Sequence, residues 1–224
     1  MDRKSVFYPV EATSVTGFVQ QVAVSYVSNG YFFYVSGFVP EGKDPRVVDA
    51  KLLARYEIDI SKWSRARRRE AGKSSLQYIR HGRLFLLLAT HGKHRFFKEE
   101  AKSIRDARRT PIKAFGYAIS HRAGHVHVRI EQSEYERLKA FLIGIGKHRV
   151  VETVEDAFLR LPYEPYAPVR RQLLNIWRAV NRVRKEAGYA PIAIECIRMK
   201  RRIVRPFSSV EASLRTRKTT LEIE

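Results

Sequence analysis

The chain has 224 residues, 44% of them hydrophobic and 29% charged, a balance typical of a soluble globular protein that excludes wholesale disorder. Its charge is unusual, because 43 Lys and Arg against 23 Asp and Glu leave a net charge of +20. Such an excess repels itself in a compact fold, so we expect a polyanionic partner to neutralise it. Nucleic acid is favoured as that partner, ahead of an anionic membrane or of charge that serves solubility alone.

The single cysteine, Cys196, cannot form an internal disulfide or a cysteine-based zinc site. No apolar run approaches the roughly 18 residues needed to cross a bilayer, and no signal-peptide core follows the charged start of the chain. We therefore expect a cytoplasmic protein with no membrane partner, in which Cys196 is a small buried apolar residue.

The first 60 residues predict two strands and a helix. Residues 19–26 and 31–39 alternate apolar and polar side chains, which predicts a hairpin turned at Ser28-Asn29-Gly30. Asp44 can cap a helix that Pro45 begins. The face of this helix that packs on the sheet is expected to carry Val48, Leu52, Leu53 and Tyr56.

The middle of the chain predicts two more hairpins joined by cationic connections. Residues 61–74 form either a short basic helix or a loop around Trp63. Strands are expected at 76–78 and 84–89, and again at 112–120 and 125–130, the last pair turned at Arg122-Ala123-Gly124.

Two helices dominate the rest of the chain. Ser133 and Glu136 form a capping box for a helix that ends near Gly144 or Gly146. Pro168 begins the longest helix, which Gly188 ends. Residues 192–206 predict one or two final strands. The whole is an α+β fold with a central antiparallel sheet, two or three helices and long basic connections. We expect one domain over 1–207, with a sub-boundary near 150–167, and a loosely held polar tail over 208–224.

The most informative motif is Gly124-His125-Val126-His127-Val128. On a strand, residues i and i+2 point to the same face, so the rings of His125 and His127 project together, from Cα atoms about 6.6 Å apart. This strand resembles the signature of the HUH (His-hydrophobic-His) single-strand endonucleases, which include replication initiators, relaxases and tyrosine transposases.

The resemblance implies a ferredoxin-like sheet, a divalent metal on the two histidines and a third polar ligand, and a tyrosine that attacks a DNA phosphodiester. The candidate nucleophiles are Tyr189, then Tyr166 and Tyr163, because they follow the histidine strand at helix ends or loops; a structural role is the alternative for each. The third metal ligand could come from His91, His94, His121 or Glu99, and the metal would be Mg²⁺, Mn²⁺ or Zn²⁺. Alternatively, the histidines line a nucleic-acid groove.

Cations and aromatic residues gather in the same stretches, which suits binding to single strands or structured RNA, because Arg binds phosphate and exposed rings stack on bases. The candidate nucleic-acid-binding residues are Trp63, Arg65, Arg67, Arg68, Arg69, Lys73, Arg108, Arg109, Arg170, Arg171, Arg178 and Arg182.

Three functions remain open from the sequence. The sharpest is a metal-dependent DNA-nicking or strand-transfer enzyme of a mobile element or replicon. A second is a non-catalytic binder of RNA or single-stranded DNA, as a subunit of a ribonucleoprotein complex or alone. A third is a metal nuclease that cuts with activated water. The sequence does not distinguish DNA from RNA.

Overall fold

The structure is a computed structural model that describes residues 8–207, so the predicted tail at 208–224 lies outside the described residues. The described chain divides into two compact units, one of residues 8–112, 120–126 and 204–207, the other of residues 113–119 and 127–203. The predicted α+β class is confirmed, because helices are combined with two antiparallel sheets. None of the described helices has both the length and the apolar character needed to span a membrane.

The first unit is built on a four-stranded antiparallel sheet in the order β4-β1-β3-β2. Along the chain, a strand is followed by two helices, two strands, one short helix and a last strand, which is the element order of the ferredoxin-like fold with two helices in the first crossover. These elements are β1 (Phe33–Phe38), α2 (Pro45–Arg55), α3 (Lys62–Glu70), β2 (Leu76–His81), β3 (Leu84–Ala89), α4 (Phe96–Glu99) and β4 (Arg105–Asp106).

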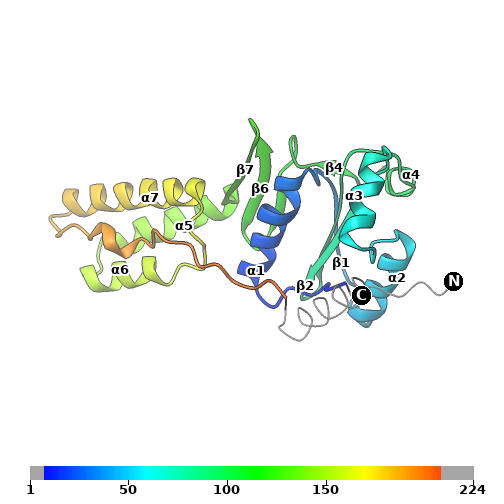
Figure 1. Cartoon of the computed structure of the whole chain (residues 1–224). Helices are drawn as coiled ribbons and strands as arrows, with labels where there is room; N and C mark the ends of the chain where they lie inside the picture. Colours follow the sequence, from blue (N-terminus) through cyan, green and yellow to red (C-terminus); the bar gives the residue numbers. More distant parts are fainter. Residues whose placement is uncertain (1–7, 208–224) are drawn as a thin grey trace, which may run out of the picture. The chain divides into compact units, whose positions relative to one another are not determined.

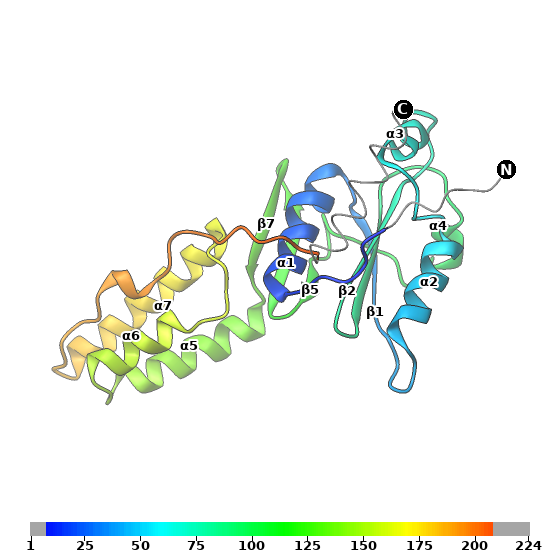
Figure 2. The same cartoon turned by 60° about the horizontal axis from the view of Figure 1, so that its bottom comes forward.

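Helices cover both faces of this sheet. Helix α1 (Val15–Gln20) lies on one face and α2 on the other (Figure 1; Figure 2). On the α2 side, Tyr56 and Phe96 are fully buried against Tyr78 and Leu87. Because both faces are covered, the side chains of β3 are almost all apolar and buried, and strict polar alternation is absent from this strand.

The strand predicted at 19–26 is wrong. Residues 15–29 are helical, as α1, a π-helical stretch η1 (Gln21–Tyr26) and a 3₁₀ turn η2 (Val27–Asn29). Ser14 caps the start, since its Oγ accepts from the Gly17 N–H at 3.1 Å, and Gly30 ends the helix with a φ of 86°. In a strand, Val22, Val24 and Tyr26 would share one buried face. In the helix, Val22 and Tyr26 are buried but Val24 is 49% exposed.

Helix α2 and the β2–β3 hairpin follow the prediction. The Asp44 side chain accepts from the Arg46 N–H at 2.9 Å, and Pro45 is the first helical residue. Leu52 and Leu53 pack against the buried cluster as expected. The basic stretch after this helix is the helix α3, which decides between the two alternatives that the sequence left open.

A buried ion pair ties α2 to the sheet. Asp49 and Arg80 are each 3% exposed, and the Arg80 Nη2 lies 2.9 Å from the Asp49 Oδ2. Arg80 also donates to Glu11 and to the Gly82 carbonyl, and the Tyr78 hydroxyl donates to Asp49 at 2.6 Å. Burial and this bond to the carboxylate raise the pKa of Tyr78. One guanidinium therefore joins α2, β2 and the segment before α1.

The second unit contains three helices beside one another (Figure 1). In α5 the predicted capping box is wrong, because the cap is Glu131, whose carboxylate accepts from the Ser133 N–H at 2.9 Å. Bonds from Lys113 and Ser133 lower the pKa of Glu131 to about 2. The helices are α5 (Gln132–Gly146), α6 (Val151–Leu159), which the sequence did not predict, and α7 (Ala167–Glu186).

The remaining elements also depart in part from prediction. Strands predicted at 192–206 are absent from this described segment, which holds a 3₁₀ turn η3 (Ile194–Cys196) and extended chain. Cys196 is buried as expected. The hairpin at 112–130 is confirmed, with its first strand divided. Its strands are β5 (Ile112–Ala114), β6 (Tyr117–Arg122) and β7 (His125–Ile130), in the sheet order β5-β6-β7.

Substituting Asp49 by Asn tests the buried ion pair. Because Arg80 would keep its charge but lose its main buried partner, we expect a loss of about 3 kcal/mol in the free energy of unfolding. Urea denaturation measures it. The control is Glu99→Gln, which removes the more exposed Arg55–Glu99 pair and should cost less than about 1 kcal/mol. Equal losses in the two variants would contradict the structural role of Asp49.

Candidate nucleic-acid interface

Helix α3 carries the most concentrated positive charge of the first unit. Ser61 caps it by accepting from the Ser64 N–H at 3.1 Å. Arg65 is 7% exposed, donates to the Ile58 carbonyl at 3.1 Å and lies over the Tyr8 ring, 5.4 Å from its centroid. Arg65 therefore anchors α3, and its burial leaves it less open to a phosphate than the exposed cations of the same helix.

The exposed side of the same helix carries the residues predicted to bind nucleic acid. Trp63 is 75% exposed, and Arg67 and Arg69 are exposed as well. Helical spacing places Trp63 and Arg67 on the side opposite Arg65. Trp63 therefore offers an open ring between cations, the arrangement in which a base stacks while its phosphate is bound.

Two Gly-Lys turns meet next to α3, at the end of the β2–β3 hairpin. Lys73 and Lys93 form a parallel bridge, in which the Ser74 N–H donates to the Lys93 carbonyl at 3.2 Å. Gly92 has a φ of 134°, and a Cβ there would lie 2.6 Å from the Ser74 nitrogen. Only glycine lets the two turns approach so closely, so Gly92 determines how Lys73 and Lys93 are placed.

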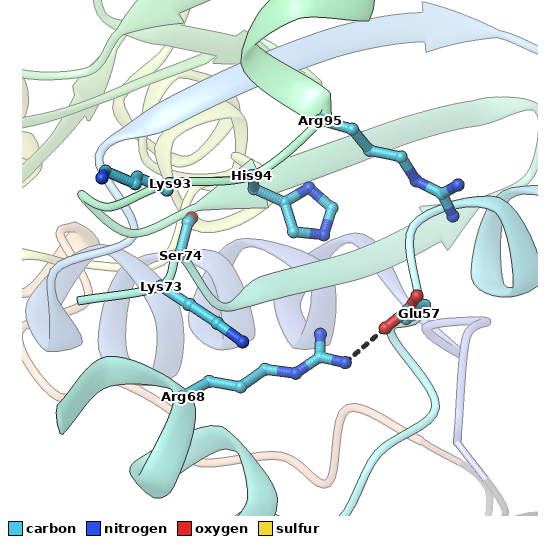
Figure 3. Close-up of a pocket in the computed structure, with 7 residues that line it drawn as sticks. All are labelled: Glu57, Arg68, Lys73, Ser74, Lys93, His94 and Arg95. Atoms are coloured by element: carbon cyan, nitrogen blue, oxygen red, sulfur yellow. Dashed lines mark hydrogen bonds and ion pairs between the residues drawn. The ribbon is translucent and has the colours of Figure 1, made fainter. Parts of the chain in front are cut away.

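The turns and α3 line an open pocket of about 270 Å³. In Figure 3, the side chains of Arg68 and Lys73 extend beneath the ring of His94, whereas that of Lys93 extends away from them. The lining residues are Glu57, Arg68, Lys73, Ser74, Lys93, His94 and Arg95, and we call this space the Gly-Lys pocket.

The Gly-Lys pocket is strongly cationic. Its single acid, Glu57, is paired with Arg68. Within residues 8–207, Lys73, Lys93 and Arg95 make no ion pair. A site with four cations and one paired acid attracts a phosphate and repels a metal ion.

His94 adds a neutral donor to this pocket. Burial, and then the charges of Arg68 and Arg95, lower the pKa of His94, so its ring is neutral at pH 7. The Nδ1 accepts from the Phe96 N–H at 3.1 Å, which places the ring proton on Nε2. A bound phosphate would stabilise the charged ring and raise its pKa again.

Other predicted cations fall on separate surfaces. Arg108 pairs with Asp106 at 2.7 Å and lies 4.9 Å from the centroid of Phe32, while Arg109 is exposed. In the second unit, Arg170, Arg171 and Arg178 line a groove along α7, and Arg182 is exposed nearby on the same helix. Arg170 is partly used in the fold, since it donates to the Pro165 carbonyl at 3.1 Å.

The structure places the three candidate tyrosines in different environments. Tyr163 is 8% exposed, with its ring 5.2 Å from that of Tyr117. Tyr166 lies under the Arg201 guanidinium, 4.8 Å away. Burial raises the pKa of both hydroxyls, which disfavours the phenolate that a nucleophile needs. Tyr189 is 43% exposed at the end of α7, with the Arg184 guanidinium 5.5 Å from its ring.

The histidines do not assemble with Glu99. His125 and His127 share the outer face of β7, as predicted, while Val128 and Ile130 point inward. This strand belongs to the three-stranded sheet and not to the ferredoxin-like one. Glu99 is bound to Arg55 at 2.8 Å, and the ring of His91 lies 6.5 Å from that of Phe33.

The described residues therefore do not fit a metal held by three protein ligands. Within 8–207, no group of three His, Cys, Asp or Glu side chains is placed to hold an ion. Among the predicted ligands, His94 lies in the cationic pocket instead. His121, the other candidate, packs on Phe32 with 4.7 Å between the ring centroids.

The pocket also contains residues that the sequence analysis did not single out. Lys93 and Arg95 belong to a long connection with many cations, and the sequence did not indicate which of these cations would line one pocket. Gly-Lys occurs four times in the sequence, at 42–43, 72–73, 92–93 and 146–147, so the two pairs that meet at the pocket do not stand out from the sequence alone. Comparison of the sequence with family models and with curated proteins finds no match in either case.

Gly92→Ala tests whether the close approach of the turns builds the pocket. Because the new Cβ would meet backbone atoms, the turns must separate, and we expect a loss of about 1–3 kcal/mol in unfolding free energy together with weaker oligonucleotide binding. Gly82→Ala is the control, since Gly82 has a φ of 57° but open space around its Cβ position. It should lose some stability and keep its affinity. Equal affinity of the two variants would contradict this role of Gly92.

Proposed function

We propose that this protein binds nucleic acid through the Gly-Lys pocket and the exposed face of α3. One observation carries the proposal: four cations from the segments 68–73 and 93–95 line a single cavity whose one acid is paired with Arg68, although the Lys93 side chain extends away from the others. Concentrated charge of one sign destabilises a fold, so its convergence on one cavity favours an anionic ligand. A phosphate group fits the donors present, namely guanidinium, ammonium and the Nε2–H of His94.

The exposed Trp63 extends the proposal from phosphate to nucleic acid. Its ring lies on the same helix as Arg68, which lines the pocket. Stacking requires an unpaired base, so single strands, loops and strand ends fit this surface better than a continuous duplex. Double-helical DNA offers its bases only at the groove edges, where an indole ring finds no face on which to stack.

Reversing two pocket charges tests the proposal. Lys73→Glu together with Arg95→Glu removes two phosphate contacts, so affinity for single-stranded oligonucleotides at low salt should fall at least about tenfold. The slope of log K against log salt should become shallower by about 1.5. Fluorescence anisotropy over a salt series measures both quantities for DNA and for RNA.

The matched control changes net charge equally, away from the pocket. Lys43 and Arg46 are exposed at the start of α2, at the opposite end of that unit from α3 (Figure 2). Lys43→Glu with Arg46→Glu should therefore leave the affinity within about threefold and the salt slope nearly unchanged. Equal effects in the two double variants, or no binding by the wild type, would contradict the proposal.

The shared outer face of His125 and His127 favours a second candidate, metal-dependent nicking of single strands. If it is correct, cleavage with Mg²⁺, Mn²⁺ or Zn²⁺ should be lost in His125→Ala and in His127→Ala, while binding, which spreads over many cations, is retained. Arg129→Ala, on the same strand face, is the control. A denaturation-resistant DNA adduct that Tyr189→Phe removes would indicate a covalent step, and cleavage without an adduct would indicate activated water. Absence of cleavage with all three metals would contradict the nicking activity and leave nucleic-acid binding as the proposed function.

A further inference from the structure

A second cavity lies on the other side of the buried Arg65. Helical spacing puts Arg68 on one side of Arg65, and Lys62 and Arg69 on the other. These last two line a space of about 610 Å³, within the size range of small-molecule sites. The cavity is lined by Tyr8, Pro9, Gln21, Ser25, Tyr26, Asn29, Tyr31, Lys62, Arg65, Arg69, Gln77, Pro206 and Phe207, and we call it the tyrosine pocket.

One wall of the tyrosine pocket offers hydrogen-bonding groups. Gln21, Ser25 and Asn29 recur every four residues along η1 and η2 and all line the space. Among the described residues, the Gln21 amide and the Ser25 hydroxyl make no hydrogen bond, whereas Asn29 donates to the Ser25 carbonyl at 3.0 Å. The wall includes a π-helical stretch, an irregularity frequent at functional sites.

The other wall is aromatic and held in place. The Tyr8 hydroxyl donates to Gln77 at 2.7 Å, and the Tyr31 hydroxyl lies 3.1 Å from the Ser75 Oγ. The rings of Tyr26 and Tyr31 lie 6.0 Å apart. Tyr26 and Tyr31 are each 4% exposed and the Arg65 guanidinium lies over the Tyr8 ring, so the tyrosines form a rigid apolar wall against which the edge of a planar ring can pack.

Arg65 brings a buried donor to the same cavity. It is 7% exposed, and its Nε has no hydrogen-bond partner among residues 8–207, although its Nη2 donates to Ile58. Buried donors are nearly always satisfied in proteins, so this one calls for an acceptor, which a water or an entering ligand can supply. At the rim, Lys62 and Arg69 are exposed and make no ion pair with any described residue.

We propose that the tyrosine pocket receives one unpaired nucleobase of the bound strand, with the phosphate next to it on Lys62 and Arg69. The inference rests on the proposed function and deepens it. The ring packs against the tyrosine wall beside Arg65, its carbonyl or ring nitrogen accepts from the Arg65 guanidinium, and the Gln21 amide reads its edge. Phosphate alone would leave the aromatic wall and the amide unused.

The test compares oligonucleotides that differ in bases and not in charge. A strand in which abasic sites replace all bases keeps every phosphate, so the ratio of its Kd to that of the intact strand reports base binding. Trp63→Ala is the background, which removes stacking outside the pocket. In this background we expect a ratio of about fivefold to a hundredfold.

Two variants remove the proposed contacts. Ser25→Phe fills the cavity, and Gln21→Ala removes the amide with little effect on folding. Both should bring the ratio toward one and leave the affinity for the abasic strand unchanged. Val24→Phe is the matched control, because Val24 is an exposed neighbour on the same helical segment that does not line the pocket. It should keep the ratio of the background.

The outcomes separate the two proposals. Salt-dependent binding with the same base ratio in Ser25→Phe, Gln21→Ala and the background would overturn the base pocket and leave nucleic-acid binding standing. Salt-dependent binding with a ratio of one in the background would do the same. Failure of the wild type to bind any strand would overturn both. Circular dichroism checks folding, and a misfolded Ser25→Phe leaves Gln21→Ala to decide.

Discussion

The close approach of the Gly92 backbone to Lys73 and Ser74 is the constraint on which the cationic site depends. Strands β2 and β3 pair in register, with Leu76 opposite Ala89, so the chain entering β2 and the chain leaving β3 emerge together. Because Gly92 has no Cβ, the segment before β2 and the segment after β3 remain hydrogen-bonded beyond the strands, between residues 72–74 and Lys93. Lys73, His94 and Arg95 are then delivered to one place by backbone geometry, and no acid is needed to hold them there.

The protein uses two of its acids to hold the fold together, while the excess of 43 Lys and Arg over 23 Asp and Glu remains as positive charge. Asp49 and Glu164 are nearly fully buried, and each pairs with arginines that hold segments together: Arg80 in the first unit, Arg202 in the second. Arg184, 1% exposed, is held without any acid by carbonyls that include those of Gly146 and Arg149, at the end of α5. These internal pairs leave the net charge unchanged, and among the described residues Lys73 and Arg95 make no ion pair, so their charge is available to a ligand.

The fold was predictable where a local rule and the burial pattern agree. Asp44 caps α2, and Pro45 supplies the fixed φ of its first residue. The apolar run of β3 is only six residues long, which is typical of a buried strand and too short for most helices. Prediction failed at Val24, where alternating β-branched residues concealed a helix whose stripe is set by packing on the sheet. The candidate site was half predictable: α3 stands out as a basic stretch, but which cations converge depends on Gly92, a contact 18 residues from Ser74 in the chain.

Helix α3 links the two cavities physically. Its buried Arg65 is the fixed point, with Arg68 facing the Gly-Lys pocket and Lys62 and Arg69 facing the tyrosine pocket. A strand that occupied both would therefore have to pass the helix, where Trp63 and Arg67 are exposed. Because both pockets are lined by residues of one helix, a strand held in one pocket keeps its next nucleotides near the other, so the two sites would bind one strand more tightly than either binds alone.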